Sequence, residues 1–190
     1  MTPFVQFVTN ILSLGTIASD IVVIFLFSII LTPLSEHGWG KKVDDFVGRR
    51  AIMLSFLVTL ASVVGSLFYS EFAHFAPCEL CWIQRGLLYT QAVILFLALF
   101  ARKEEHVRRF QNLTQKACLA LSAIGFPIAA YHMYLQFGGD ALVPCSAIGP
   151  TCSYVYFITY GYITIPTMSL TAFALILCFM LLHRPAAEKK

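Results

Sequence analysis

The sequence contains few charged residues. Asp, Glu, Lys and Arg make up only 12% of its 190 residues, whereas 58% are hydrophobic. A soluble globular domain has about a quarter of its residues charged and about half apolar. The charges also stand in clusters, which leaves long uncharged runs. This composition argues against a soluble chain and favours an integral membrane protein.

Several chemical signatures are missing too. The chain has no Cys-x-x-Cys-His haem motif, no iron–sulfur cysteine pattern and no glycine-rich nucleotide-binding motif. It also lacks internal repeats and low-complexity segments. Its net charge is only +3, and the basic residues follow a membrane topology, so we expect no nucleic-acid partner.

Five apolar runs are long enough to cross a lipid bilayer. They lie within Phe4–Leu34 and at about Ala51–Phe72, Cys81–Ala101, Ala117–Phe137 and Ile163–Leu182. The connections are short, so we predict an all-α integral membrane bundle without a soluble domain. We divide it into an extra N-terminal transmembrane helix with a cytoplasmic linker, residues 1–48, and a four-helix transmembrane core, residues 49–190.

The first run contains Asp20, whose carboxylate would cost roughly 2.5–3.5 kcal/mol at the centre of a membrane helix. We therefore expect Asp20 to face other helices or to lie near the membrane surface. No Lys or Arg precedes this run, and no clear small-residue cleavage site follows it. These features disfavour a cleavable signal peptide.

Basic residues mark the predicted cytoplasmic side. Twelve of the thirteen Lys and Arg residues lie between runs one and two, between runs three and four, or after run five. Because cytoplasmic connections carry an excess of Lys and Arg, we predict five spans with the N-terminus outside and the C-terminus inside. The exception is Arg85, which belongs to the outward half of the molecule.

The six cysteines divide into two groups. Those on the predicted outer side are Cys78, Cys81, Cys145 and Cys152. Disulfides persist outside a bacterial plasma membrane, so this group is redox-capable. We expect the other two, Cys118 and Cys178, to be small buried hydrophobic residues.

The stretch PCELCWIQR, residues 77–85, joins a Cys-x-x-Cys pair to a basic residue. Pro77 suits the first turn of a helix, which places Cys78 and Cys81 at the N-terminus of the third span. The N–H groups and dipole at that end favour a thiolate, the form that attacks disulfides. Arg85 shares a helix face with Cys81 and favours the ionised sulfur further. The alternative is a static disulfide, with Arg85 reaching lipid phosphates.

A second cysteine pair lies in an outward loop that contains no Lys or Arg. Its centre is PCSAIGPTC, residues 144–152, where a Gly-Pro step favours a turn that lets Cys145 and Cys152 meet. Such a disulfide would be accessible to another protein's thiolate, or would only order the loop. His132, at a similar depth, is a candidate to donate a hydrogen bond or a proton to a carbonyl ligand. A role in helix packing would explain it as well.

These groups together suggest a route for electrons. A dithiol outside the membrane would reduce the loop pair, and the loop pair would reduce Cys78–Cys81. The helix mouth opens into lipid, where a quinone headgroup beside Cys81 could accept the electrons. Arg85 would then stabilise negative charge on the quinone oxygens. We therefore predict Cys81, Arg85 and His132 as quinone-binding residues.

These residues resemble the bacterial disulfide-bond formation protein B family, DsbB/BdbC, over about Arg49–Leu182. The shared features are PCELCWIQR, AAYHMYLQF at residues 129–137, the outward loop pair, and TIPTMSL at residues 164–170. The resemblance implies a membrane thiol:quinone oxidoreductase that re-oxidises a DsbA-like thioredoxin-fold partner. The electron acceptor would be ubiquinone or menaquinone from the membrane quinone pool. The implied location is the bacterial inner (plasma) membrane, with the active cysteines on the periplasmic side.

The resemblance also implies a role for each of these residues. Cys81 would form the thiolate–quinone species with Arg85 beside it, and Cys78 would exchange with the loop pair. Cys145 would form the mixed disulfide with the partner, and Cys152 would resolve toward Cys78. Two features depart from the family: the loop between its two cysteines is short, and the first span is additional to the four-helix core.

Three other functions fit parts of the sequence. A vitamin K epoxide reductase-like enzyme also uses a quinone and two cysteine pairs, but there the loop pair precedes the Cys-x-x-Cys. A metal-binding membrane protein would use the four outward cysteines. However, Cys145 and Cys152 are too widely spaced for the common Cys₄ pattern, and Arg85 would oppose a cation. We therefore predict no metal. A structural membrane protein would carry two static disulfides.

Overall fold

The computed structural model describes residues 2–31, 38–100, 107–142 and 150–183. Within these ranges the structure consists of helices and loops, with one isolated β-bridge between Thr159 and Ile163. The helices are α1 (Pro3–Leu31), α2 (Gly38–Leu67), α3 (Glu79–Phe100), α4 (Val107–Gln136) and α5 (Ile165–Leu182). A π-helical turn, η2 (Phe68–Phe72), continues α2. Five helices of the described chain are long and apolar enough to cross a membrane. The prediction of an all-α protein with five spans is confirmed.

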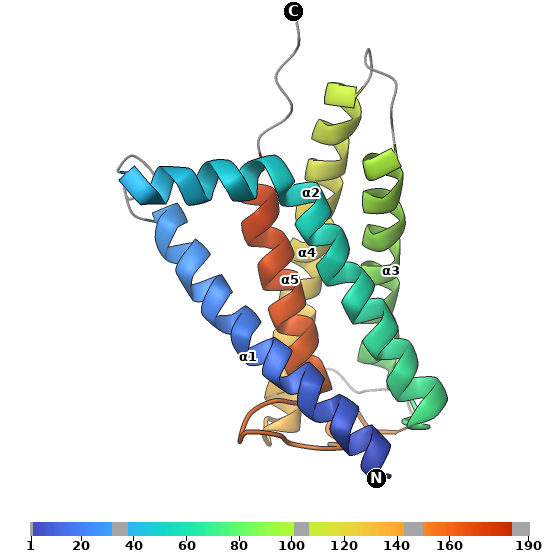
Figure 1. Cartoon of the computed structure of the whole chain (residues 1–190). Helices are drawn as coiled ribbons and strands as arrows, with labels where there is room; N and C mark the ends of the chain where they lie inside the picture. The colour runs from blue at the N-terminus through green and yellow to red at the C-terminus, as the bar shows by residue number, and fades with distance from the viewer. Residues whose placement is uncertain (1, 32–37, 101–106, 143–149, 184–190) are drawn as a thin grey trace, which may run out of the picture.

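Helix α5 is the centre of the bundle (Figure 1). It packs against α4, α2 and α1, and ten of its 18 residues are buried. A helix that is apolar on all sides is expected in such a position, because it can be surrounded by other helices. The remaining helices are therefore arranged around α5.

Two apolar clusters hold the helices together. The larger joins α2, α3, α4 and α5 and contains the fully buried Cys118. The smaller joins α1 and α2 to α5 and contains Cys178, whose side chain is 5% exposed. Both cysteines are therefore buried hydrophobic residues, as the sequence predicted.

Gly125 allows α4 to approach α5 closely. A Cβ atom at this position would overlap the ring of the fully buried Phe173. We therefore predict that Gly125→Ala lowers the free energy of unfolding by about 1–3 kcal/mol through overpacking. Thermal unfolding of the purified protein in detergent measures this effect. Gly86→Ala is the matched control, because a Cβ there meets nothing within 4 Å. Equal melting temperatures for the two variants would contradict the prediction.

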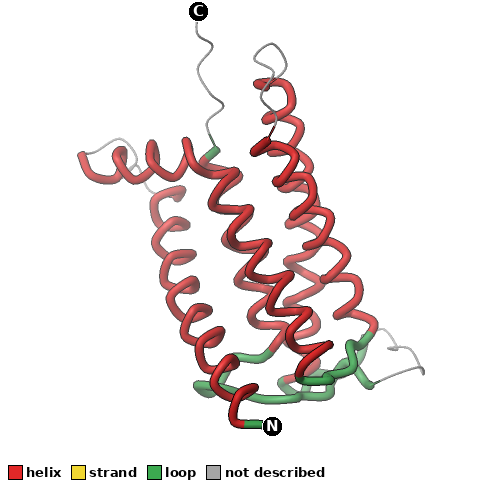
Figure 2. Tube along the Cα trace, turned by 45° about the vertical axis from the view of Figure 1, so that its right-hand side comes forward, coloured by secondary structure: helices red, strands yellow, loops and turns green. Residues whose placement is uncertain are grey.

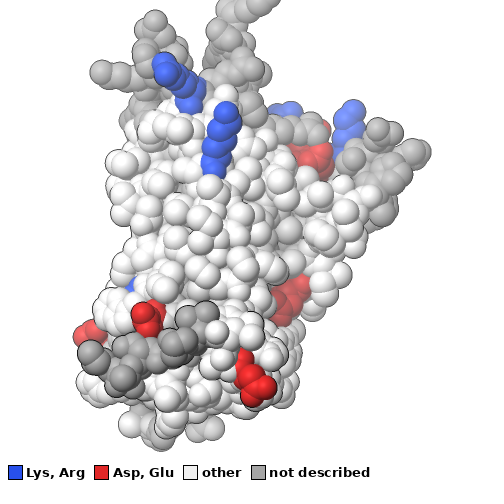
Figure 3. Space-filling view, turned by 180° about the vertical axis from the view of Figure 1, so that it is seen from behind, with Lys and Arg blue, Asp and Glu red and all other residues white. Residues whose placement is uncertain are grey.

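The two ends of the bundle differ. The described loops gather at the same end as the N-terminus (Figure 2). The first part of α2 lies across the opposite end (Figures 1 and 2), and most of the Lys and Arg visible in Figure 3 lie at that end. The predicted orientation depends on this distribution.

The start of α2 differs from the sequence prediction. Residues 38–48, expected to belong to the cytoplasmic linker, are part of α2. Val47 and Ala51 are buried against α5 and α1, while the Arg50 guanidinium lies 4.3 Å from the centre of the Phe46 ring. A segment with one apolar face and one basic face forms a helix at a membrane surface, which explains why the helix begins before the apolar run.

Asp20 faces other parts of the protein, as expected. Its carboxylate accepts hydrogen bonds from the Thr171 hydroxyl of α5 at 2.6 Å and from the Tyr162 hydroxyl at 2.8 Å. Two donors offset much of the cost of removing a carboxylate from water. This is how α1 accommodates an acidic residue inside an apolar run.

Candidate active site

Cys78 is the N-cap residue of α3. Its carbonyl oxygen accepts the Trp82 N–H at 3.1 Å, and its sulfur accepts the Cys81 N–H at 3.4 Å. Pro77 therefore lies just before the cap, because α3 begins at Glu79. The prediction that Pro77 occupies the first turn is wrong by two residues. The sulfur consequently lies where an N-cap side chain meets the free N–H groups of a helix.

The two sulfur atoms of the Cys-x-x-Cys pair lie close together. The Sγ atoms of Cys78 and Cys81 are 2.9 Å apart and share a hydrogen bond. This bond is the largest cause of a lowered pKa of the Cys78 thiol, and His132 lowers it further, whereas burial opposes both effects. The contacts of Cys78 with Cys81 and His132 therefore favour its ionised form.

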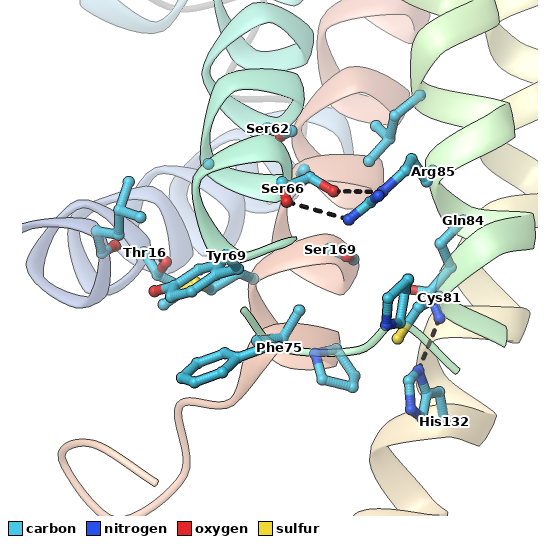
Figure 4. A pocket seen from close by; sticks show the side chains of 18 of the residues that line it. Thr16, Ser62, Ser66, Tyr69, Phe75, Cys81, Gln84, Arg85, His132 and Ser169 are labelled. Carbon is cyan, nitrogen blue, oxygen red and sulfur yellow. Dashed lines mark hydrogen bonds between the residues drawn. The ribbon is translucent and has the colours of Figure 1, made fainter. Parts of the chain in front are cut away.

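His132 lies beside Cys78 and is almost fully buried, at 1% exposure. Its Nε2 is 3.5 Å from the Cys78 sulfur, and its Nδ1 is 3.0 Å from Nε2 of Gln84. Because the Gln84 amide N–H donates to Nδ1, the ring proton is on Nε2 and points toward the sulfur. In Figure 4, His132 and Arg85 lie on opposite sides of Cys81.

We predict that His132→Phe raises the pKa of Cys78. The variant loses a hydrogen bond to the ionised sulfur, worth about 1.5–3 kcal/mol, or roughly one to two pH units. In the wild type, the lowered pKa means that Cys78 stays ionised even below neutral pH. In the variant, Cys78 should become protonated at a higher pH than in the wild type. Thiolate absorbance near 240 nm of the reduced protein, corrected with Cys78→Ser, measures the midpoint. His74→Ala, an exposed histidine in the preceding segment, is the control. An unchanged midpoint in His132→Phe would contradict the assignment.

Arg85 connects α3 to α2. Its Nε donates to the Ser66 hydroxyl at 2.8 Å and its Nη2 to the Ser66 carbonyl at 3.0 Å. Its guanidinium also lies 5.2 Å from the centre of the Trp82 ring. These contacts hold a positive charge on the same helix as Cys81, and both residues line the cavity (Figure 4).

A cavity of about 390 Å³ opens beside the dithiol. Its size falls in the range of roughly 300–1,000 Å³ that is usual for ligand pockets. Cys81 and Arg85 line one side, and residues of α1, α2 and α5 form the other walls (Figure 4). Gln136 also lines the cavity, and its buried Oε1 has no hydrogen-bond partner among the described residues.

The described part of the outward loop, residues 150–164, packs against the segment that precedes Cys78. The Tyr156 ring stacks on Phe75 with centroids 4.3 Å apart, and its hydroxyl donates to the Ala76 carbonyl at 2.8 Å. Cys152 is 2% exposed, is disulfide-bonded and belongs to the same apolar cluster as Cys78. The described end of the loop, at Cys152, therefore belongs to the same cluster as the Cys-x-x-Cys pair.

The structure brings together most of the predicted site residues. Cys78, Cys81, Arg85 and His132 lie around one end of the cavity, and Cys152 is beside them. Cys145 lies outside the described residues. The atoms that could bind a metal, the sulfurs of Cys78 and Cys81 and a ring nitrogen of His132, lie within 4.8 Å of one another.

Two residues of the site were missed in the sequence. Gln84, 3% exposed, orients His132, and Ser66 holds Arg85. A buried glutamine three residues after Cys81 is a detectable signal, because it must find a hydrogen-bond partner. Ser66 has no comparable signal, since serine is common in membrane helices.

Fold and site define a multi-pass membrane protein with a redox-capable dithiol next to an apolar cavity. The family model "Disulfide bond formation protein DsbB" matches residues 48–183. The chain therefore belongs to the DsbB family and is a disulfide-formation protein of the oxidoreductase type. This family is the one that the sequence resemblance predicted.

Individual relatives agree with this family. The chain is 38% identical to "Disulfide bond formation protein C" of Bacillus subtilis over 130 residues, 67% of this chain and 88% of the relative. It is 33% identical to "Probable disulfide formation protein C" of Halalkalibacterium halodurans over 149 residues, 76% of this chain and 98% of the relative. No solved structure matches.

Proposed function

We propose that the protein is a thiol:quinone oxidoreductase that re-oxidises a DsbA-like thioredoxin-fold protein and transfers the electrons to a membrane quinone. One observation carries the proposal. The dithiol of Cys78 and Cys81 packs with the buried, disulfide-bonded Cys152 and also lines an apolar cavity together with Arg85. Electrons would have a route in through the loop and a route out through the cavity.

In this proposal the partner dithiol reacts first with a loop disulfide of Cys145 and Cys152. A partner thiolate attacks the Cys145 sulfur, which breaks the loop disulfide and leaves the electron pair on Cys152. The second partner thiol then displaces Cys145, and the partner leaves oxidised. The two electrons and two protons that the partner lost now belong to the loop pair.

The loop pair then reduces the disulfide of Cys78 and Cys81. The Cys152 thiolate attacks the Cys78 sulfur, which breaks the Cys78–Cys81 bond and leaves the electron pair on Cys81. Attack of the Cys145 thiolate on Cys152 re-forms the loop disulfide and releases Cys78. The Cys81 N–H and His132 then stabilise negative charge on Cys78. The net result is a reduced dithiol beside the cavity.

The cavity is suited to a quinone, either ubiquinone or menaquinone. When bound, the quinone supplies an acceptor for two electrons and two protons per disulfide formed. Arg85 would hold a positive charge near the carbonyl oxygens, and the unpartnered Gln136 Oε1 could accept a hydrogen bond from a hydroxyl. The apolar walls would exclude water from the reacting sulfur.

We also propose that the protein lies in the plasma membrane of a bacterium, with its N-terminus outside and its C-terminus inside. Most visible basic side chains lie at the end opposite the dithiol (Figure 3), which supports a periplasmic position for the cysteines. Residues 49–190 would then form the catalytic bundle and residues 1–48 the added helix with its cytoplasmic connection.

The test is anaerobic quinone reduction by the purified protein, supplied with a reduced thioredoxin-fold dithiol. We expect turnover that depends on the dithiol, with ubiquinone or menaquinone analogues as acceptors. Cys118→Ala should keep this turnover, because Cys118 is buried away from the site. Absence of turnover with both quinone classes, in a protein that remains folded, would reject the proposal.

A metal site is the second candidate, because three potential ligands lie within 4.8 Å. Two features disfavour a cation. His132 accepts a hydrogen bond from Gln84 at Nδ1, whereas a metal-bound histidine usually donates its second ring N–H, and the Arg85 charge lies nearby. Metal analysis of protein purified under reducing conditions distinguishes the two functions: stoichiometric zinc or copper, lost in Cys78→Ser, would favour the metal site.

A further inference from the structure

Helix α1 is an addition to the family core. The family model begins at residue 48, after α1 has ended. An alignment of 149 residues already covers 98% of the Halalkalibacterium relative. That relative therefore has no room for a further 29-residue helix such as α1. The role of α1 has to be sought in this chain's own structure.

Polar contacts anchor α1 at the loop end of the bundle. Asp20 accepts hydrogen bonds from α5 and from the loop before it, and the Ser13 hydroxyl lies 2.6 Å from the Thr159 hydroxyl. The helix packs mainly against α5 and has few contacts with α2. A Cβ atom added at Gly65 of α2 would lie 3.6 Å from the Leu12 side chain, so α1 and α2 come near each other there. This arrangement fixes α1 to α5 and leaves space between α1 and α2.

One face of α1 borders the cavity beside the dithiol. The residues of α1 that line it are Ile11, Leu12, Gly15, Thr16 and Ser19. Their spacing places them on a single helix face. In Figure 4, Thr16 on α1 lies across the cavity from Cys81 and Arg85 on α3. The cavity therefore extends from the reactive sulfur to the added helix.

We propose that α1 is the wall of this cavity that contacts the prenyl tail of the quinone. The proposal rests on the proposed function and adds the residues that bind the tail. A ring placed against Cys81 and Arg85 leaves the far part of the cavity for the first prenyl unit. There α1 offers two apolar side chains and the open space over Gly15, where a Cβ would meet nothing within 4 Å. The tail then leaves toward lipid between α1 and α2.

The test measures binding directly, by isothermal titration of the oxidised, full-length protein in detergent. The two probes have the same benzoquinone ring. One carries a single prenyl unit and the other does not. A matching pair of naphthoquinones covers the menaquinone class. The variant is Gly15→Leu, whose side chain would occupy the far part of the cavity. Gly86→Leu is the matched control, since Gly86 is also helical with open space around it but does not line the cavity.

For Gly15→Leu we expect the Kd of the prenylated quinone to rise about tenfold or more. The Kd of the tail-less quinone should stay within about twofold, and Gly86→Leu should change neither. An unchanged Kd for the prenylated quinone overturns the inference, and so does an equal rise for both probes. Wild-type protein that binds no quinone of either class would instead reject the proposed function itself.

A variant at a second lining residue replaces Gly15→Leu if that variant misfolds. If Gly15→Leu does not give a cooperative thermal transition, Ser19→Leu is measured in its place. Ser28→Leu is its control, because Ser28 is exposed on the same helix and does not line the cavity. The same two Kd values decide the outcome.

Discussion

Quinone reduction should fall at least about 10³-fold when Cys81 is replaced by serine. The expected loss is that large because removal of a reacting nucleophile usually eliminates most of the catalysis. Cys78 and Cys81 both line the cavity, but Arg85 lies one helical turn from Cys81, whereas Cys78 contacts His132. We therefore propose that Cys81 delivers the electrons to the quinone. Stopped-flow absorbance of the quinone, with a reduced thioredoxin-fold dithiol as donor, measures the rate.

The same variant should still react with the partner at its loop. Cys152 is disulfide-bonded in a cluster with Cys78, and Cys81→Ser leaves that bond intact. One equivalent of partner dithiol should therefore be oxidised in a single turnover while quinone reduction is lost. Cys118→Ala again serves as the control. Quinone turnover in Cys81→Ser above about a tenth of the wild-type rate would remove Cys81 from the proposed route.

Replacing Arg85 with glutamine should lower the rate of quinone reduction about 10²–10³-fold, the usual effect of removing one group that stabilises developing charge. The Ser66 contacts hold the guanidinium in place before any ligand binds, so little reorganisation is needed during the reaction. Exchange between the partner and the loop should keep its rate, because that step takes place at other sulfurs. Separate single-turnover measurements of the two steps test this difference.

Two further variants separate charge from geometry at Arg85. Arg85→Lys keeps the charge but cannot reproduce both bonds to Ser66, so it should recover part of the lost rate. Ser66→Ala removes one of the two acceptors and keeps the backbone carbonyl, so its effect should stay below about tenfold. If Arg85→Gln slowed both steps equally, Arg85 would be a structural residue rather than part of a quinone site.

The sequence predicted the fold well because membrane insertion imposes simple rules. Twenty or so apolar residues in a row have few alternatives to a spanning helix, and all five spans were found. The start of α2 was missed for the opposite reason. Residues 38–48 are polar enough to resemble a linker, and their helix depends on burial of Val47 against α1 and α5. Such tertiary contacts cannot be read from a short amphipathic segment.

The site was predicted in part. Cys78, Cys81 and Arg85 are close in sequence, and helix geometry alone places them together. The contact between His132 and Cys78 depends on how α4 packs against α3, so the sequence could only suggest a similar depth. The structure places His132 next to Cys78 and orients it with Gln84. The contribution of α1 to the cavity was not foreseen, because polar positions such as Ser19 resemble ordinary small residues in a membrane helix.

The bent α2 has a consequence for where the chemistry takes place in the bilayer. Its first part lies across the end of the bundle and carries Arg50 over Phe46, a combination that stays at the level of lipid headgroups. Helix α3, with 22 residues, is about 33 Å long at 1.5 Å per residue, close to the hydrocarbon thickness of about 30 Å. We therefore expect the first part of α2 to fix the depth of the molecule in the bilayer. The sulfur of Cys81 is then expected just inside the opposite leaflet, near the boundary with its headgroups.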